Sequence, residues 1–200
     1  LLAILIIYAP KLWEILLTSS LLSLFVSASL KKIFNVPRPA RVFDNEIFEI
    51  IGRTFRGYTS LPSGHSIATF LVITSIFFAF MPRGNKFDKA IWCIFSFTIG
   101  LFLAFTRVGV GAHYPLDVIF GSIIGYILTI LGVIINKKKN LWTWINNPKF
   151  LIIFIILFTG LGISIANKII ENNLFIYYIS LISIITTLYI SIKTYVKKEY

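Results

Sequence analysis

The stretch LPSGHSIATFLVITSIFFAF, residues Leu61–Phe80, decides the class of fold. Its apolar part, Ser66–Phe80, has the composition of a helix that lies in lipid. Its opening, PSGH at residues 62–65, makes a poor start for a buried strand, because proline and glycine weaken strand interiors. A membrane segment that begins with these four residues needs a reason, and the rest of the chain supplies one.

The whole chain shares this apolar character. Of its 200 residues, 57% are hydrophobic and 14% are charged, whereas about a quarter of a soluble domain is charged. No apolar run alternates with the period of two that membrane β-strands show. The sequence therefore predicts an all-α fold, a polytopic transmembrane helical bundle of about six spans. The predicted spans are Leu12–Leu30, Ser66–Phe80, Ala90–Thr106, Val118–Ile135, Phe150–Ala166 and Leu174–Ile192.

We expect one membrane-embedded domain over residues 1–200, with a functional core at 12–135 and two additional C-terminal spans at 150–192. The C-terminal spans carry nothing of catalytic character, so they are interpreted as packing helices or a dimer surface. Leu1–Ala9 is either the tail of an earlier span or the start of one helix through Pro10, because proline both kinks and ends helices. Since the first residue is Leu rather than Met, we expect an N-terminal piece before it.

The formal net charge of +11 is distributed between the apolar runs. Membrane topology and anionic lipid explain this placement, and the chain has no zinc-finger or RNP-type motif, so no nucleic-acid partner is expected. With six spans, the basic segments MPRGNKFDK, NKKKN and the C-terminal tail fall on one side, which is predicted to be cytoplasmic. The opposite side is basic as well, which conflicts with that rule unless its cations have another function. These cations are Lys31, Lys32, Arg38, Arg41, Arg53, Arg56 and Arg107.

Three stretches on this second side, KKIFNVPRP, PSGH and TRVGVGAHYPLD, carry polar residues that suit a phosphate. Lys31 and Arg38 lie at a predicted helix end, with Pro39 stopping the helix. Cations, and the forked guanidinium above all, match phosphate oxygens. A helix that begins at Ser63-Gly64 adds free backbone N–H groups and the positive end of its dipole, and glycine lets the backbone approach closely. We therefore predict an anion cradle made of Lys31, Arg38, Ser63, Gly64 and Arg107.

Both histidines of the chain, His65 and His113, fall in the same stretches. Asp117 follows His113 by four residues, so the two share a face if a helix begins nearby; the argument weakens if the loop through Pro115 is not helical. Asp117 would fix the imidazole tautomer and raise its basicity, leaving the other nitrogen free to attack. His65 would protonate the leaving oxygen.

Simpler roles stay open for several of these residues. Lys32 is expected to reach the lipid headgroups as a plain interfacial anchor, and Asp117 alone would serve as a helix cap. Arg41, Arg53 and Arg56 are either headgroup ligands or interfacial anchors.

The three stretches resemble the signature of the type 2 phosphatidic acid phosphatase superfamily, which includes the vanadium haloperoxidases. The family pattern K-x6-RP, PSGH and SR-x5-H-x3-D is matched at residues 31–39, 62–65 and 106–117. The spacing within each motif agrees. The one departure is Thr106, which replaces the usual serine but keeps a hydroxyl. The resemblance covers roughly Leu12 to Ile135.

The resemblance implies a metal-independent phosphatase that uses no cofactor and forms a phosphohistidine intermediate. At the matched positions, His113 is the nucleophile, Asp117 orients it and His65 is the general acid. The residues that hold the phosphate are Lys31, Arg38, Ser63, Gly64 and Arg107.

The segments RPARVFD, IGRTFRGYTSLPSGHS and TRVGVGAHYPLDVIFG look most like the bacterial lipid A 1-phosphatases. This narrower resemblance implies the 1-phosphate of lipid A as substrate, and a bacterial inner membrane location with the active site facing the periplasm. Undecaprenyl diphosphate and phosphatidylglycerophosphate are the alternative substrates. The expected partners are the lipid substrate and the bilayer.

Two other classes of function are compatible with part of the sequence. A non-catalytic protein that binds or transports an anionic lipid would use the same cations, but the chain shows neither inverted repeats nor discontinuous helices. The apolar spans disfavour a soluble haloperoxidase relative. The loop Ala40–Ser60, which carries Arg41, Arg53 and Arg56, is predicted to lie over the site as a short amphipathic helix in the membrane interface and to select the substrate.

Overall fold

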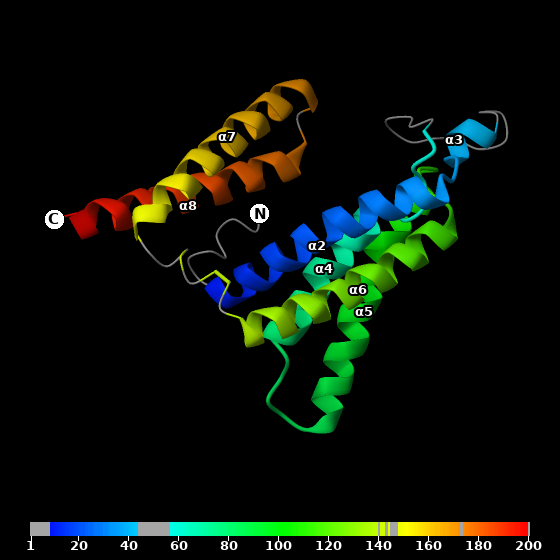
Figure 1. Ribbon diagram of the computed structural model, residues 1–200, viewed down its shortest axis with the longest axis horizontal. Helices are drawn as coiled ribbons and strands as arrows, with labels where there is room; N and C mark the ends of the chain where they lie inside the picture. The colour runs from blue at the N-terminus through cyan, green and yellow to red at the C-terminus, as the bar shows by residue number, and fades with distance from the viewer. Residues whose placement is uncertain are drawn as a thin grey trace. The chain divides into compact units, whose positions relative to one another are not determined.

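The computed structural model describes residues 9–43, 57–139, 141–142, 144, 148–172 and 174–199. These residues form helices and connections, and no strand occurs among them, which confirms the all-α class (Figure 1). The helices are α2 (Pro10–Phe34), α3 (Pro39–Val42), α4 (Gly64–Ala79), α5 (Lys86–Gly109), α6 (Pro115–Lys138), α7 (Pro148–Asn172) and α8 (Phe175–Glu199).

Five of these helices, α2, α5, α6, α7 and α8, are long and apolar enough to cross a membrane. The remaining predicted span, Ser66–Phe80, corresponds to α4, which is apolar but has only 16 residues. At 1.5 Å per residue α4 is about 24 Å long, against about 30 Å for the hydrocarbon core of a bilayer. Each predicted span corresponds to one helix. Of the segment Leu1–Ala9, all but Ala9 lies outside the described residues.

The chain forms two compact units, one of Ile15–Lys137 and one of Leu1–Glu14 with Lys138–Tyr200. In the second unit, α7 packs against α8, with Phe158 and Thr187 almost fully buried. Trp13, from the first turn of α2, contacts Phe158 with ring centroids 6.3 Å apart. All the predicted phosphate-binding and catalytic residues belong to the unit Ile15–Lys137.

Helix α4 is the centre of the unit Ile15–Lys137. Its residues Ile67 and Leu71 pack with Leu128 of α6, and α2 covers this cluster with Leu22 and Val26. Its other apolar face places Phe70 against Ala104 of α5 and Val118 of α6. These contacts bury apolar side chains on several faces of α4, so its first turn is held in a fixed place.

Two glycines on α6 bring its backbone against α4. A Cβ at Gly121 would lie 2.7 Å from the carbonyl oxygen of Ser63, and one at Gly125 would lie 2.5 Å from that of Ile67. Both distances are far inside van der Waals contact, so no larger residue fits without moving a helix. Small residues serve this purpose in membrane helix packing, because they let backbones approach closely.

The helix ends that carry the motifs gather at one end of the unit. Figure 1 shows the C-terminal ends of α2 and α5 and the N-terminal ends of α4 and α6 together beside α3. The basic connection between α4 and α5, and the lysines at the end of α6, lie at the opposite end. This arrangement within the unit matches the predicted separation of the basic loops from the motif residues.

One local prediction was wrong, because Pro39 does not stop the helix that carries Lys31. That helix, α2, ends earlier at Phe34, and Asn35 adopts a left-handed backbone with φ 45°. The N–H of Asn35 donates to the carbonyl oxygen of Lys31 at 3.1 Å. Asparagine is one of the few residues that take this conformation readily at a helix C-terminus, while Pro39 instead opens α3, where its missing N–H costs nothing.

Candidate active site

The PSGH stretch opens α4 as the sequence predicts. Ser63 is the N-cap of the helix, and its hydroxyl oxygen accepts hydrogen bonds from the N–H and the hydroxyl of Ser66, at 3.4 and 3.0 Å. The N–H of Ser63 donates to the carbonyl oxygen of Asp117 at 3.0 Å. The next N–H groups, of Gly64 and His65, have no partner within the helix and form the positive end of its dipole, which is where an anion binds.

Lys31 comes to this helix start from the last turn of α2. Its Nζ lies 3.6 Å from the point where a Cβ on Gly64 would be. Because Gly64 has no side chain, the ammonium lies directly beside the backbone of the cradle. Lys32, the next residue on α2, is exposed.

Arg38 is held by the loop before PSGH and by the backbone of the third motif. Its guanidinium donates to the hydroxyl and carbonyl oxygens of Thr59, at 3.4 and 3.5 Å, and to the carbonyl oxygen of Ala112 at 3.4 Å. The N–H of Arg38 donates to the carbonyl oxygen of Gly57 at 3.0 Å. The arginine therefore joins the loop before PSGH to the loop before α6.

Arg107 lies on the last turn of α5, which extends beyond the predicted span Ala90–Thr106. Its carbonyl oxygen accepts the N–H groups of Ala112 and His113, at 3.1 and 3.3 Å, so its backbone fixes the position of the histidine. Its side-chain Nε is buried, with no hydrogen-bond partner among the described residues. A buried donor of this kind is costly unless something accepts its proton, and a bound oxyanion would do so.

His113 and Asp117 form the predicted contact, with Nδ1 and Oδ2 3.3 Å apart and both residues buried. Helix α6 begins at Pro115, so His113 precedes the helix. The two residues are four apart in the sequence, but they do not share a face of one helix. Asp117 instead reaches back from the first turn and also accepts the N–H of Tyr114 at 3.0 Å. Capping and pairing with the histidine, which the sequence left as alternatives, both occur.

An ionised carboxylate only accepts hydrogen bonds. With Oδ2 of Asp117 facing Nδ1, the proton of a neutral His113 belongs on Nδ1 and the lone pair is then on Nε2. Nε2 is therefore the nitrogen available to attack an electrophile.

Ser60 is a site residue that the sequence did not predict. This residue is 0% exposed, and its hydroxyl donates to Oδ2 of Asp117 at 2.5 Å. Its N–H donates to the carbonyl oxygen of Val36 at 3.1 Å, which fixes the loop beside the first motif. Ser60 lies two positions before PSGH, outside all three spacing patterns, so no signal in the single sequence distinguished it.

His65 lies on the first turn of α4 and is exposed. The charges of Arg107, His113, Arg38 and Lys31 all act on its imidazole. The structure thus brings the cations and both histidines from the three motifs close together, and Asp117 contributes a carboxylate beside His113. Such an excess of positive charge at a helix N-terminus favours a phosphate.

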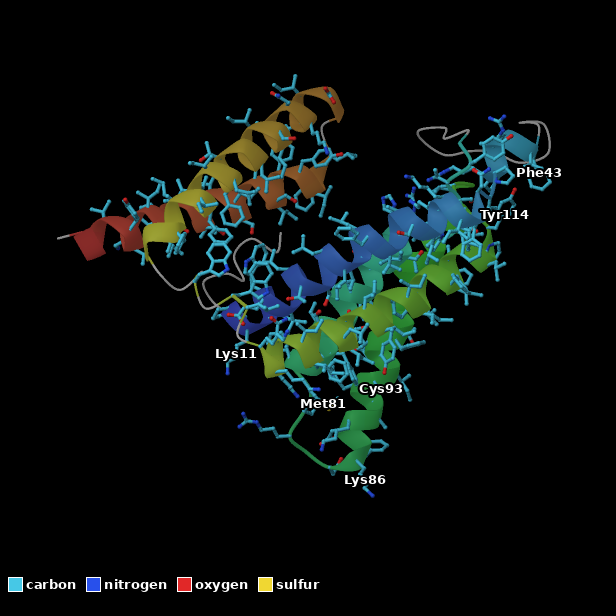
Figure 2. All side chains as sticks on the ribbon, in the orientation of Figure 1. Lys11, Phe43, Met81, Lys86, Cys93 and Tyr114 are labelled. Carbon is cyan, nitrogen blue, oxygen red and sulfur yellow. The ribbon has the colours of Figure 1, made fainter. Side chains whose placement is uncertain are left out.

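Apolar and aromatic residues form the outer edge of the site. A cavity of about 290 Å³ adjoins His113 and is lined also by Pro39, Phe43 and Tyr114. Figure 2 shows Phe43 and Tyr114 together at this end of the unit, with ring centroids 6.5 Å apart, and Lys86 at the other end. Burial, and then the charge of Asp117, raises the pKa of Tyr114 above its ordinary value, so the phenol keeps its proton.

The predicted headgroup contacts are only partly described. Arg41 lies at the end of α3 and is exposed, with its guanidinium carbon 4.1 Å from the ring centroid of Tyr58. Arg53 and Arg56 lie outside the described residues, as does most of the predicted amphipathic helix over the site.

Thr106, the departure from the family motif, donates its hydroxyl to the carbonyl oxygen of Leu103 on its own helix at 2.6 Å. In the described parts of the chain, no three His, Cys, Asp or Glu side chains gather as metal ligands.

An apolar helical bundle with a cationic, histidine-bearing helix N-terminus is typical of membrane proteins that bind a phosphate group. The chain belongs to the PAP2 superfamily, whose profile matches residues 12–141. Phosphatases of this family are hydrolases that act on phosphate esters.

Two known proteins are similar to this chain. Phosphatidylglycerophosphatase B of Haemophilus influenzae is 33% identical to the chain over 86 residues, which cover 42% of the chain and 34% of that protein. The matched region thus spans about a third of the length of this curated relative. A crystal structure of LpxE from Aquifex aeolicus superposes with a TM-score of 0.47 and 28% identity, covering 64% of the chain and 71% of that structure.

Proposed function

We propose that this protein is an integral membrane lipid phosphatase that removes a phosphate from a lipid headgroup through a phosphohistidine intermediate. The observation that carries the proposal is the pairing of His113 with Asp117 beside the cationic start of α4. In this proposal residues 1–200 act as one membrane-embedded phosphatase domain, and α7 and α8 serve packing or self-association.

In the first step, Nε2 of His113 attacks the phosphorus while the bond between phosphorus and the lipid oxygen breaks. Asp117 keeps the proton on Nδ1 and stabilises the positive charge that develops on the ring. Imidazolium His65 donates a proton to the departing lipid oxygen, which leaves as an alcohol or, from a diphosphate, as a phosphate. Lys31, Arg38, Arg107 and the N–H groups at the start of α4 stabilise the equatorial oxygens of the transition state.

In the second step, water attacks the phosphorus of the phosphohistidine. Neutral His65 takes a proton from that water, the bond between phosphorus and Nε2 breaks, and inorganic phosphate is released. The enzyme returns to its starting protonation state, so the net reaction is hydrolysis. No step uses a metal ion, and this independence belongs to the proposal.

For the substrate, we propose the 1-phosphate of lipid A. Support comes from the resemblance of the segment between the first two motifs to lipid A 1-phosphatases. The second candidate is phosphatidylglycerophosphate, which is favoured by the 33% identity to a protein named phosphatidylglycerophosphatase B. Undecaprenyl diphosphate is the third. The shared requirement is an anionic phosphate on a lipid that the bilayer delivers to the site.

For the location, we propose the bacterial cytoplasmic membrane with the active site facing the periplasm. Support comes from the basic connection between α4 and α5 and the lysines at the end of α6, which lie at the other end of the unit from the site. Lys/Arg-rich loops favour the cytoplasmic side. The cations at the site itself would then be retained on the opposite side for phosphate binding.

The test is phosphate release by purified protein in detergent containing EDTA, with the three candidate lipids offered in parallel and His113→Ala as the control. Release from lipid A, with mass spectrometry showing loss of the 1-phosphate, would support the narrow proposal. Preference for another lipid would keep the mechanism and replace the substrate. Activity that survives in His113→Ala would contradict the phosphohistidine, and no release from any lipid would favour a non-catalytic lipid-binding protein.

A further inference from the structure

A groove of about 510 Å³ runs between α2 and α4. Its α2 side is formed by residues three and four apart on one helix face, including Ser20, Ser23 and Ser27, and it reaches Lys31. Its α4 side begins at Gly64, and its floor includes the buried side chains of Ile67 and Leu71. The groove is therefore apolar at its base, and its α2 side is open because serine leaves the room that a leucine would fill.

The groove is continuous with the proposed phosphate site. Lys31 and Gly64 line the groove, and Nζ of Lys31 lies beside the backbone of Gly64 at the start of α4. From Lys31 the groove follows α2 down to Ser20, a distance of about 16 Å at 1.5 Å per residue. A phosphate bound beside Lys31 and Gly64 would therefore place the hydrocarbon chain of its lipid at the entrance of the groove.

The serines in the groove do not make it a polar site. The hydroxyl of Ser23 donates to the carbonyl oxygen of Ser20 at 2.8 Å, within the same helix. A hydroxyl satisfied by its own helix is compatible with an apolar neighbour, whereas an unsatisfied one is costly in lipid. The groove has a cation at one end and an apolar floor. It is therefore complementary to a molecule in which an anionic headgroup is joined to a hydrocarbon chain.

We infer that this groove, here called the α2–α4 groove and lined by Ser20, Ser23, Ser27, Lys31, Gly64 and Leu71, holds a hydrocarbon chain of the lipid phosphate that the protein hydrolyses. The inference rests on the proposed function and adds a determinant of chain length to it. His65 is the residue after Gly64. The proposed general acid is therefore next to the Gly64 end of the groove, where the lipid oxygen would depart. The chain bound in the groove would align that oxygen for protonation.

The first test compares dihexanoyl and dipalmitoyl phosphatidic acid as substrates of the full chain in detergent. Phenylalanine at position 23 or 27 (Ser23→Phe, Ser27→Phe) fills the groove, so the ratio of kcat/KM for the long to the short lipid should fall about tenfold, since losing the burial of a few methylenes changes affinity by that order. Ser29→Phe is the matched control, because Ser29 is on the same helix and does not line the groove. An unchanged ratio in Ser23→Phe and Ser27→Phe, or an equal fall in Ser29→Phe, would overturn the inference.

The second test does not need turnover, so it separates the groove from the proposed reaction. A bimane label is placed at Leu24→Cys on the rim of the groove, or at Phe25→Cys as the control, in a Cys93→Ser background in nanodiscs of phosphatidylcholine. Leu24 and Phe25 are 66% and 80% exposed, and only Leu24 lines the groove. A phosphonate analogue of phosphatidic acid with brominated chains should quench Leu24→Cys more strongly. Equal quenching at the two positions would mean that the brominated analogue lies only in the bulk lipid. This result would reject the groove as a binding site for the chain, whether or not the protein hydrolyses a phosphate.

Discussion

The hydroxyl of Ser60 donates to Oδ2 of Asp117 at 2.5 Å, and the two residues are 0% and 2% exposed. The same oxygen faces Nδ1 of His113 at 3.3 Å and accepts the N–H of Tyr114 at 3.0 Å. One carboxylate oxygen thus joins the loop before PSGH, the start of α6 and the proposed nucleophile. Ser60 acts on the reaction through Asp117, so we regard it as a positioning residue.

Ser60→Ala should lower kcat about tenfold to a hundredfold with little change in KM, because a hydrogen bond to a buried charged group contributes about 1.5–3 kcal/mol. Steady-state kinetics would measure this, and Ser60→Cys should recover part of the loss. Ser122→Ala is the matched control, since Ser122 is also buried but bonds to its own helix at the carbonyl oxygen of Val118. Equal losses in the two variants would mean that Ser60 matters only for folding.

Asp117→Asn should reduce kcat by about a hundredfold or more, by analogy with other histidine–carboxylate pairs in which the amide imposes the wrong tautomer. Asparagine keeps the volume and an oxygen that can cap α6, so the protein should still fold. Size-exclusion chromatography and circular dichroism would verify folding alongside the kinetics. Near-normal kcat in a folded variant would contradict the proposed role of Asp117.

Lys31→Gln should reduce kcat by about a hundredfold, as expected for loss of one donor to the transition state. Lys32→Gln should change kcat little, because Lys32 is exposed next to Lys31 and lies outside the cradle. The pair has the same loss of charge, so a comparison of their kinetics separates phosphate binding from general membrane electrostatics. Similar effects of the two substitutions would argue for electrostatics alone.

Gly121→Ala should destabilise the protein by about 1–3 kcal/mol, because its Cβ would meet the backbone of Ser63 and neither helix can yield cheaply. Gly109→Ala is the control, since nothing lies within 4 Å of its Cβ position. The thermal unfolding midpoint in detergent would report the difference. A midpoint for Gly121→Ala equal to that of Gly109→Ala would show that the close approach of α4 and α6 is not required.

Replacing Arg53 and Arg56 with alanine should raise KM about fivefold per arginine and leave kcat nearly unchanged, if each contributes about 1 kcal/mol of attraction to an anionic headgroup. The measurement is KM for the preferred lipid in mixed micelles. No change in KM would count against headgroup contact and leave interfacial anchoring as their role.

Much of the fold could be predicted from the sequence because the apolar runs are long and the interruptions are strongly polar. The run at Val118–Ile135 needed only the bilayer thickness to be recognised, and it lies inside α6. The start of α4 was predictable from Ser63 and Gly64, whose cap and backbone properties are local.

The rest depended on contacts between segments far apart in the chain. Ser60 lies 57 positions from Asp117, so their hydrogen bond leaves no periodic signal. The end of α2 was misplaced because Pro39 is a strong local signal, whereas the left-handed Asn35 that ends the helix is a weak one. The position of Arg107 was misassigned because the predicted span ended at Thr106, whereas α5 continues to Gly109.

The shortness of α4 has a consequence for the depth at which chemistry takes place. A helix of about 24 Å cannot reach both surfaces of a hydrocarbon layer of about 30 Å. If the C-terminal end of α4 stays at one surface, the phosphate cradle at its other end lies below the plane of the opposite headgroups. The lipid must then descend to react, and the distance it descends grows with the thickness of the membrane. We therefore expect the turnover rate to depend on bilayer thickness, which assays in phosphatidylcholine vesicles of different chain lengths would measure.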